Sequence, residues 1–195
     1  MFWGEATLEA NQATAPAAKF TGTFAGGIAA VSDTTGDLQI GVTDTGATPD
    51  ALNYARLDKD GVVEQSPVSI FSNGVDADNV GDLVRSGFDL MWAWRRGAGQ
   101  VMFGVTNLSG TILKSAVQVV NDTNVTPPAI AVDGDGVAYL FWSERIAPTT
   151  LRLAKVQRDG TVVFTKTIAS AYSPYNDPNP VGIVYDSTDK RLHGF

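Results

Sequence analysis

Cysteine is absent from this chain of 195 residues, and histidine occurs only once, at His193. Without cysteine the protein has no disulfide bonds, no thiolate metal ligands and no cysteine nucleophile, so packing alone must hold the fold together. No apolar run approaches the ~18 residues that cross a bilayer as a helix. The longest runs, such as VAYLFW at 137–142, have the length of a strand. We therefore expect no membrane insertion.

Basic residues are also few, with 14 lysines and arginines against 21 aspartates and glutamates and a formal net charge of −7. Because phosphate neutralisation needs clustered basic residues and these are scattered, the composition argues against binding to nucleic acid. The first residues, MFWGEATLEANQ, have neither the basic nor the apolar region of a secretory signal. One domain of this length buries about 70% of its unfolded surface. We therefore predict a single domain over 1–195 with no cofactor.

A hairpin pattern recurs along the chain with a period near 49 residues. Alternating apolar residues, a turn and a second β-rich run appear at 52–63, 101–112 and 151–163. The turn glycines are spaced by 49 and 50 residues and are Gly61, Gly110 and Gly160. Leu8 lies 49 residues before Leu57, which indicates a further copy at the start of the chain. Periods of this length are typical of stacked or radially arranged units.

The strand that precedes each turn has one bulky and one small face. The bulky columns are Trp3, Leu52, Val101 and Leu151, followed by Glu5, Tyr54, Phe103 and Leu153. The opposite face carries a small residue in every copy, namely Ala6, Ala55, Gly104 and Ala154. Alternating side chains point to opposite faces of a strand, so this pattern predicts sheets that pack face to face at close distance.

A second hairpin precedes each of these hairpins. It is clearest in PAIAVDGDGVAYLFWSE at 128–144, and its counterparts lie at 28–44, 82–96 and 182–195. Each copy ends with a large residue at a matching place, which is Val42, Trp94, Trp142 or Phe195. A full unit therefore has four strands, A to D, in about 49 residues. The chain begins with strands C and D, continues through three complete units and ends after strands A and B.

The repeated four-stranded unit resembles the blades of the β-propeller superfamily along nearly the whole chain. The stretch PAIAVDGDGVAYLFW at 128–142 is most similar to blades of sialidase-like and secreted bacterial propellers. The resemblance implies an all-β fold with four blades' worth of strands. The Asp-box of sialidase-like blades is not met, because VQRDGTVVF at 156–164 lacks its serine and tryptophan. Sialidase chemistry is therefore not carried over.

Two closed arrangements suit a chain that begins within a blade. A single chain can form a four-bladed ring in which strands from both ends share one blade. A homodimer can instead close as an eight-bladed ring, with each chain completing the other's divided blade. The sequence leaves both open.

Three features of the sequence could take part in binding or catalysis, and each also has a structural interpretation. Asp133 and Asp135 in DGDG could begin a metal site, but Val137 resumes the strand at once, which favours a turn. His193 falls in the strand column of Ile40, Trp92 and Leu140, which predicts a packed residue rather than a catalytic one. The recurring tryptophans could stack on sugars, but their matched positions favour packing between blades.

Loops offer the better candidate for a ligand-binding face, because scaffold strands give rigidity and connections give recognition. The B to C and D to A connections contain RRGAG, NDTNVTPP, SERIAPTT and SAYSPYNDPNP. Turn chemistry alone also explains such Pro- and Asn-rich connectors. The candidate binding residues on this face are Arg95, Arg96, Glu144, Arg145, Tyr172, Tyr175, Asn176 and Asp177.

The leading hypothesis is a non-catalytic binding module for a glycan or a protein partner, located outside the cell, on a cell surface or on a virion. The resemblance to sialidase-like blades implies an alternative, a glycoside hydrolase or lyase that uses loop acids such as Asp76, Asp78 and Asp177. A third hypothesis is an engineered or excised propeller fragment that has no ligand and serves for studies of folding and assembly.

Overall fold

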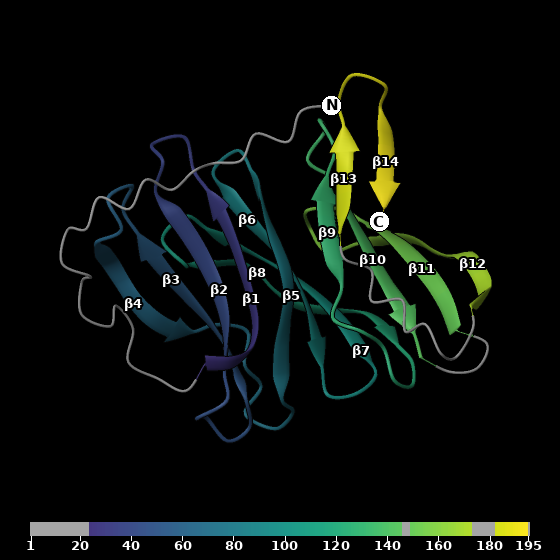
Figure 1. Ribbon diagram of the computed structural model, residues 1–195, viewed down its shortest axis with the longest axis horizontal. Helices are drawn as coiled ribbons and strands as arrows, with labels where there is room; N and C mark the ends of the chain where they lie inside the picture. Colours follow the sequence, from purple (N-terminus) through teal and green to yellow (C-terminus); the bar gives the residue numbers. More distant parts are fainter. Residues whose placement is uncertain (1–23, 146–148, 173–181, 195) are drawn as a thin grey trace.

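The computed structural model describes residues 24–145, 149–172 and 182–194. In this part of the chain it contains three four-stranded sheets and one two-stranded hairpin (Figure 1). The first sheet has strands β1 (Phe24–Ser32), β2 (Leu38–Asp44), β3 (Ala51–Leu57) and β4 (Val63–Ser69). The second has β5 (Asp78–Ser86), β6 (Asp89–Arg96), β7 (Gln100–Asn107) and β8 (Ile112–Asn121).

The third sheet has β9 (Ala129–Val132), β10 (Ala138–Glu144), β11 (Thr149–Val156) and β12 (Val162–Tyr172). The hairpin has β13 (Ile183–Asp186) and β14 (Arg191–Gly194). Every ladder is antiparallel, and the strands of each sheet lie in chain order. The predicted all-β fold of repeated four-stranded sheets resembling propeller blades is confirmed. The predicted strands around Leu8 and the residue Phe195 lie outside the described residues.

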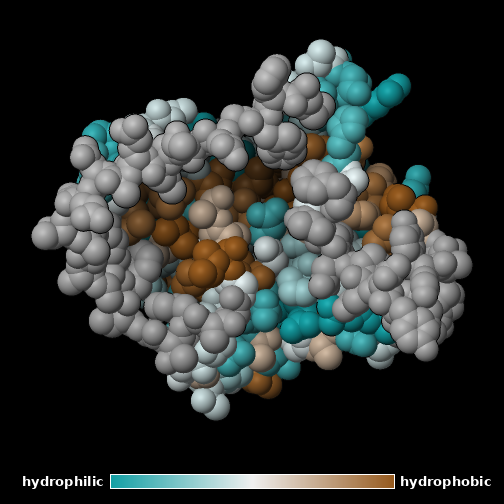
Figure 2. Space-filling model, viewed as in Figure 1, coloured by the Kyte–Doolittle hydropathy of each residue, from teal (hydrophilic) through white to brown (hydrophobic). Residues whose placement is uncertain are grey.

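The first strands of successive sheets lie next to one another. β1 contacts β5, β5 contacts β9, and β9 contacts β13. Figure 1 shows these strands between the outer strands β4 and β12, which lie at opposite ends of the view. On the side seen in Figure 2, apolar residues gather over β1 and β2. The described residues contain no helix long and apolar enough to cross a membrane.

The first inter-sheet junction pairs the bulky face of one sheet with the small column of the next, as predicted. Tyr54 of sheet β1–β4 packs in one cluster with Trp92 and Trp94 of sheet β5–β8, and all three are fully buried. A Cβ on Gly41 would lie only 2.6 Å from the ring of Trp92, so the sheets approach closely where side chains are absent. Burying each large apolar side chain stabilises the fold by about 1.5–3 kcal/mol.

The second inter-sheet junction repeats this arrangement. Phe103 of sheet β5–β8 packs with Trp142 and Ala154 of sheet β9–β12 in a single buried cluster. Trp94 and Trp142 are both fully buried, so the prediction that these tryptophans pack between blades is confirmed. His193 lies in β14 as expected, but its side chain is 52% exposed, so the prediction of a packed residue is wrong. In the described residues this hairpin has only two strands, whereas the other sheets have four.

The turns between the strands share one five-residue geometry. This geometry explains why Asp-Gly and Ser-Gly pairs recur in the sequence. Gly61, Gly110 and Gly160 all have positive φ, between 77° and 87°, which glycine adopts at little cost. In DGDG, Oδ1 of Asp133 accepts the backbone N–H groups of Asp135 and Val137, at 3.0 Å each. This geometry supports the turn interpretation of the DGDG sequence.

Candidate functional site

The predicted loop face takes shape where sheet β5–β8 meets sheet β9–β12. The connection from β8 to β9 lies along the end of β10, with the N–H of Thr126 donating to Ser143 O at 2.9 Å. The N–H of Arg145 donates to Asn124 O at 2.9 Å. The N–H of Val125 in the same connection donates to Ala98 O, just after β6, at 2.9 Å. The ends of β6 and β10 therefore lie beside one connection, and three predicted residues, Arg95, Glu144 and Arg145, lie at one junction.

Arg95 is a partly buried cation with little compensation. Its NH1 group donates to the carbonyl oxygen of Val125 at 3.4 Å, a long hydrogen bond. Its Nε is buried and has no hydrogen-bond partner, and no carboxylate of the described residues forms an ion pair with it. Burial and then the charge of Arg145 lower the pKa of Arg95. The cost of removing this guanidinium from water is therefore not offset by an ion pair with an acidic side chain.

Glu144 lies in a more crowded setting. The hydroxyl of Thr150 donates to its Oε2 at 2.8 Å, and Nε of Arg152 lies 3.3 Å from its Oε1. Burial raises the pKa of Glu144, and the neighbouring carboxyl group of Asp122 raises it further. The backbone of Glu144 pairs with that of Val125 in an isolated antiparallel bridge, so Glu144 helps to hold the β8–β9 connection against β10.

Arg96 belongs to the other junction, although it follows Arg95 directly. Its Nε lies 2.7 Å from Oδ1 of Asp78 and its NH2 group 3.0 Å from Oδ2, in a pair that is almost fully buried. The NH2 group also donates to the carbonyl oxygen of Phe71, and Trp94 Nε1 donates to the same Asp78 at 3.0 Å. Because neighbouring residues of a strand point to opposite faces, Arg96 braces the first junction instead of joining Arg95.

Of the remaining four predicted residues, Tyr172 is the last residue of β12, and its backbone pairs with Thr149 at the same end of sheet β9–β12 as Glu144. The other three, Tyr175, Asn176 and Asp177, lie outside the described residues. Asp133 and Asp135, the two metal candidates of the sequence analysis, lie in the β9–β10 turn, at the other end of β10 from Glu144. There Asp133 accepts two backbone N–H groups, and Asp135 is exposed.

Another cluster of possible metal ligands lies on the β13–β14 hairpin. Ligand atoms of Asp186, Asp189 and His193 fall within 4.8 Å of one another, and all three residues are exposed. One oxygen of each aspartate already accepts a backbone N–H, from Thr188 and from Arg191. These aspartates therefore serve the turn.

Asp82 is the notable residue that the sequence analysis did not select. It lies on the inner strand β5 opposite Ala93, and the equivalent ladder positions hold the apolar residues Ala29, Ala129 and Ile183. Its Oδ2 accepts the N–H of Ile130 at 3.2 Å, across the junction to β9. Burial raises the pKa of Asp82. A charged residue in an otherwise apolar column is the signal that would have identified it.

Comparisons with known proteins establish the fold only. No protein-family model matches the chain, and no curated protein matches its sequence. A GH43 endo-arabinanase from Bacillus licheniformis is similar in structure, with 15% identity, a TM-score of 0.55, and coverage of 87% of this chain and 64% of that one. A eukaryotic initiation factor shows 15% identity and a TM-score of 0.45, with 76% and 34% covered.

The chain thus spans less than two thirds of the length of the arabinanase. At 15% identity, the shared property is the architecture of repeated four-stranded antiparallel sheets. No specific propeller family follows from this similarity.

Proposed function

We propose that this chain is a non-catalytic binding module that recognises an acidic glycan, on a secreted, cell-surface or virion protein. The recognition face is the end of the junction between sheets β5–β8 and β9–β12, where Arg95, Glu144 and Arg145 lie. The observation that carries the proposal is the guanidinium of Arg95, which is partly buried and has no carboxylate partner among the described residues. A carboxylate from a ligand would supply the missing compensation.

The chemistry of the guanidinium supports a carboxylate as the recognised group. Arginine presents a planar set of donors that matches a carboxylate in a two-point contact, and such contacts are stronger when they are partly desolvated. Glu144 is tied to Thr150 and Arg152, so it does not neutralise Arg95. Sugar hydroxyls can in turn hydrogen-bond to the polar groups of the β8–β9 connection. The net charge of −7 disfavours long-range attraction, so recognition depends on these short contacts.

The test compares acidic and neutral forms of one sugar. Trigalacturonate and its fully methyl-esterified form are titrated into the protein by calorimetry, beside a glycan array of acidic and neutral oligosaccharides. We expect trigalacturonate to bind and the ester to bind at least about tenfold more weakly, because a charged hydrogen bond is lost.

Two variants complete this experiment. Arg95→Gln should remove the binding of acidic sugars, whereas Arg191→Gln, which changes an exposed arginine on the β13–β14 hairpin, should leave it unchanged. Equal binding of the acid and its ester, or an array with no acidic ligand, would contradict the proposal.

A second candidate function, glycoside hydrolysis, is favoured by one observation. Burial raises the pKa of Asp82, which lies on the inner strand β5, and a raised pKa is a property of carboxyl groups that act as general acids. Of the loop acids, Asp78 is held in a buried ion pair and Asp76 accepts a hydrogen bond from Asn73. A hydrolase also needs a second carboxylate about 5–9.5 Å away across the substrate.

Because the similar structure is an endo-arabinanase, arabinan is the first substrate to test. Reducing ends released by the wild-type protein and lost in Asp82→Asn would support hydrolysis. Absence of turnover on arabinan and on a panel of aryl glycosides would remove this candidate.

A further inference from the structure

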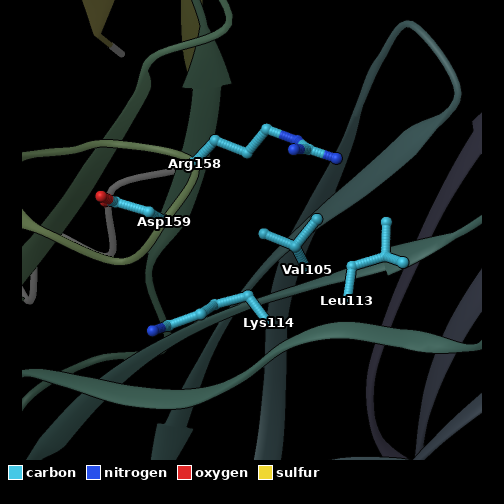
Figure 3. A pocket seen from close by; sticks show the side chains of 5 residues that line it. All are labelled: Val105, Leu113, Lys114, Arg158 and Asp159. Carbon is cyan, nitrogen blue, oxygen red and sulfur yellow. The ribbon is translucent and has the colours of Figure 1, made fainter.

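A cavity of about 370 Å³ lies between β7, β8 and the β11–β12 turn (Figure 3). Its two cations, Lys114 and Arg158, point to opposite sides, and Arg158 is paired with Asp89. The cavity therefore offers no convergent set of polar groups. Such a set is present in the exposed loop that joins β4 to β5, around the side chain of Asn73.

The side-chain amide of Asn73 is held through both of its polar atoms. Its Oδ1 accepts the backbone N–H groups of Val75 and Asp76, at 3.0 Å each. Its Nδ2 donates to Oδ2 of Asp76 at 2.9 Å. Two backbone donors on one carbonyl oxygen stabilise the negative charge that develops there when a nucleophile attacks the carbon. The amide carbon of Asn73 is therefore polarised for attack.

The backbone nitrogen of Gly74 is the nucleophile that this position offers. Its attack on Cγ of the preceding residue closes a five-membered imide ring. A Cβ at Gly74 would meet nothing within 4 Å, so the loop leaves space for the ring, and glycine has no side chain to shield its nitrogen. The N–H of Gly74 donates to Oγ of the exposed Ser72 at 3.2 Å. A hydroxyl both accepts and donates protons, so Ser72 connects this amide proton to solvent.

We propose that Asn73 is a site of spontaneous deamidation, with water as the co-reactant. The Gly74 nitrogen loses its proton and bonds to Cγ of Asn73, and the Cγ–Nδ2 bond breaks. The lost proton leaves with Nδ2 as ammonia. Water then adds to either carbonyl group of the imide and opens the ring, which gives aspartate or isoaspartate at residue 73. No oxidation or reduction takes place.

The modification changes both the charge and the path of the connection between two sheets. A carboxylate replaces a neutral amide beside Asp76, so one hydrogen bond is lost and two like charges face each other. Isoaspartate also adds a methylene group to the main chain of the β4–β5 connection. The site shares no residue with the proposed glycan face, so the two proposals stand or fall separately.

The experiment follows the folded protein during incubation at neutral pH and body temperature. Intact mass and tryptic peptide mapping report the carboxylate, and labelling with isoaspartate methyltransferase reports isoaspartate. We expect conversion of residue 73 at a rate at least equal to that in a synthetic peptide of residues 70–77, because the loop supplies the two donors to Oδ1. The rate should rise with pH, since the attacking nitrogen must lose its proton.

Asn107 is an internal control in the same molecule. Its Oδ1 also accepts two backbone N–H groups, those of Ser109 and Thr111, at 3.0 and 2.9 Å. The residue that follows it is Leu108, whose side chain shields the backbone nitrogen. We therefore expect Asn107 to convert at least about tenfold more slowly than Asn73.

Two glycine variants complete the test. Gly74→Ala shields the nucleophile and should slow conversion at least about tenfold, whereas Gly134→Ala, in another open turn, should convert as the wild type does. The proposal is overturned if Asn73 stays intact while the peptide converts, or if Gly74→Ala converts as fast as the wild type. A rate that does not change with pH, or equal conversion of Asn107, would also overturn it.

Discussion

The backbone of Gly104 lies against the ring of Phe71, so closely that a Cβ on residue 104 would be 2.7 Å from Cζ. Gly104 belongs to β7, and Phe71 lies in the connection between β4 and β5. The contact therefore joins sheet β1–β4 to the small column of sheet β5–β8. It is an example of the packing between a bulky and a small face that the repeat predicts.

Gly104→Ala should destabilise the protein, because the added methyl group overlaps a buried ring. Overpacking of this kind costs about 1–3 kcal/mol of unfolding free energy. Gly134→Ala is the matched control, since a Cβ there meets nothing within 4 Å. Chemical denaturation followed by tryptophan fluorescence measures both variants. Equal stability of the two would contradict the close-packed junction.

Arg96 and Asp78 should act as a structural pair rather than as ligand contacts. Arg96→Met leaves Asp78 charged in a fully buried place, so we expect a loss of about 3–5 kcal/mol in the free energy of unfolding. The double variant Arg96→Met with Asp78→Leu removes both charges and should recover much of that loss. Thermal unfolding of the wild type, of Arg96→Met, of Asp78→Leu and of the double variant tests this, and strictly additive losses would argue against the pairing.

Asp82 should make stability depend on pH in a defined direction. Burial raises its pKa in the folded state, so its protonated form favours folding. This contribution is fully present below the ordinary pKa of an aspartate and is lost as the pH rises through the raised pKa. Asp82→Asn should remove that part of the fall in stability. The free energy of unfolding of both proteins is measured by denaturation from acid to neutral pH. If it changes with pH equally in the variant and in the wild type, this prediction is wrong.

Asp133 should stabilise its turn, and Asp135 should not. Asp133→Ala loses the acceptor for two backbone N–H groups and the partner of the Tyr139 hydroxyl, which should cost about 1–2 kcal/mol. The carboxylate of the exposed Asp135 has no such role, so Asp135→Ala should match the wild type within about 0.5 kcal/mol. Thermal melts of both variants provide the comparison. A larger loss in Asp135→Ala would point to a different use of DGDG.

The fold was predictable because its signals are local and repeated. The glycines of the five-residue turns, the alternation along β3, β7 and β11, and the small residues Ala55, Gly104 and Ala154 can all be read from spacing. Ala55, Gly104 and Ala154 lie on equivalent faces of their sheets, opposite Ile40, Trp92 and Leu140. Such patterns follow from strand geometry alone.

The candidate site was predictable only in part, because inter-sheet contacts join residues that lie far apart in the chain. Strand alternation could have separated Arg95 from Arg96, but the partner of Arg96 depends on how two sheets meet. The same is true of Asp122 beside Glu144 and of Ile130 beside Asp82.

The Nε resonance of Arg95 offers the most direct test of the glycan-binding proposal, because this nitrogen is buried and has no partner in the unliganded protein. It is observed by NMR while trigalacturonate and its methyl ester are added in parallel. The account predicts a saturable shift with the acid and little change with the ester. An Arg95 resonance that stays in place with the acid, in a protein that remains folded, would contradict it.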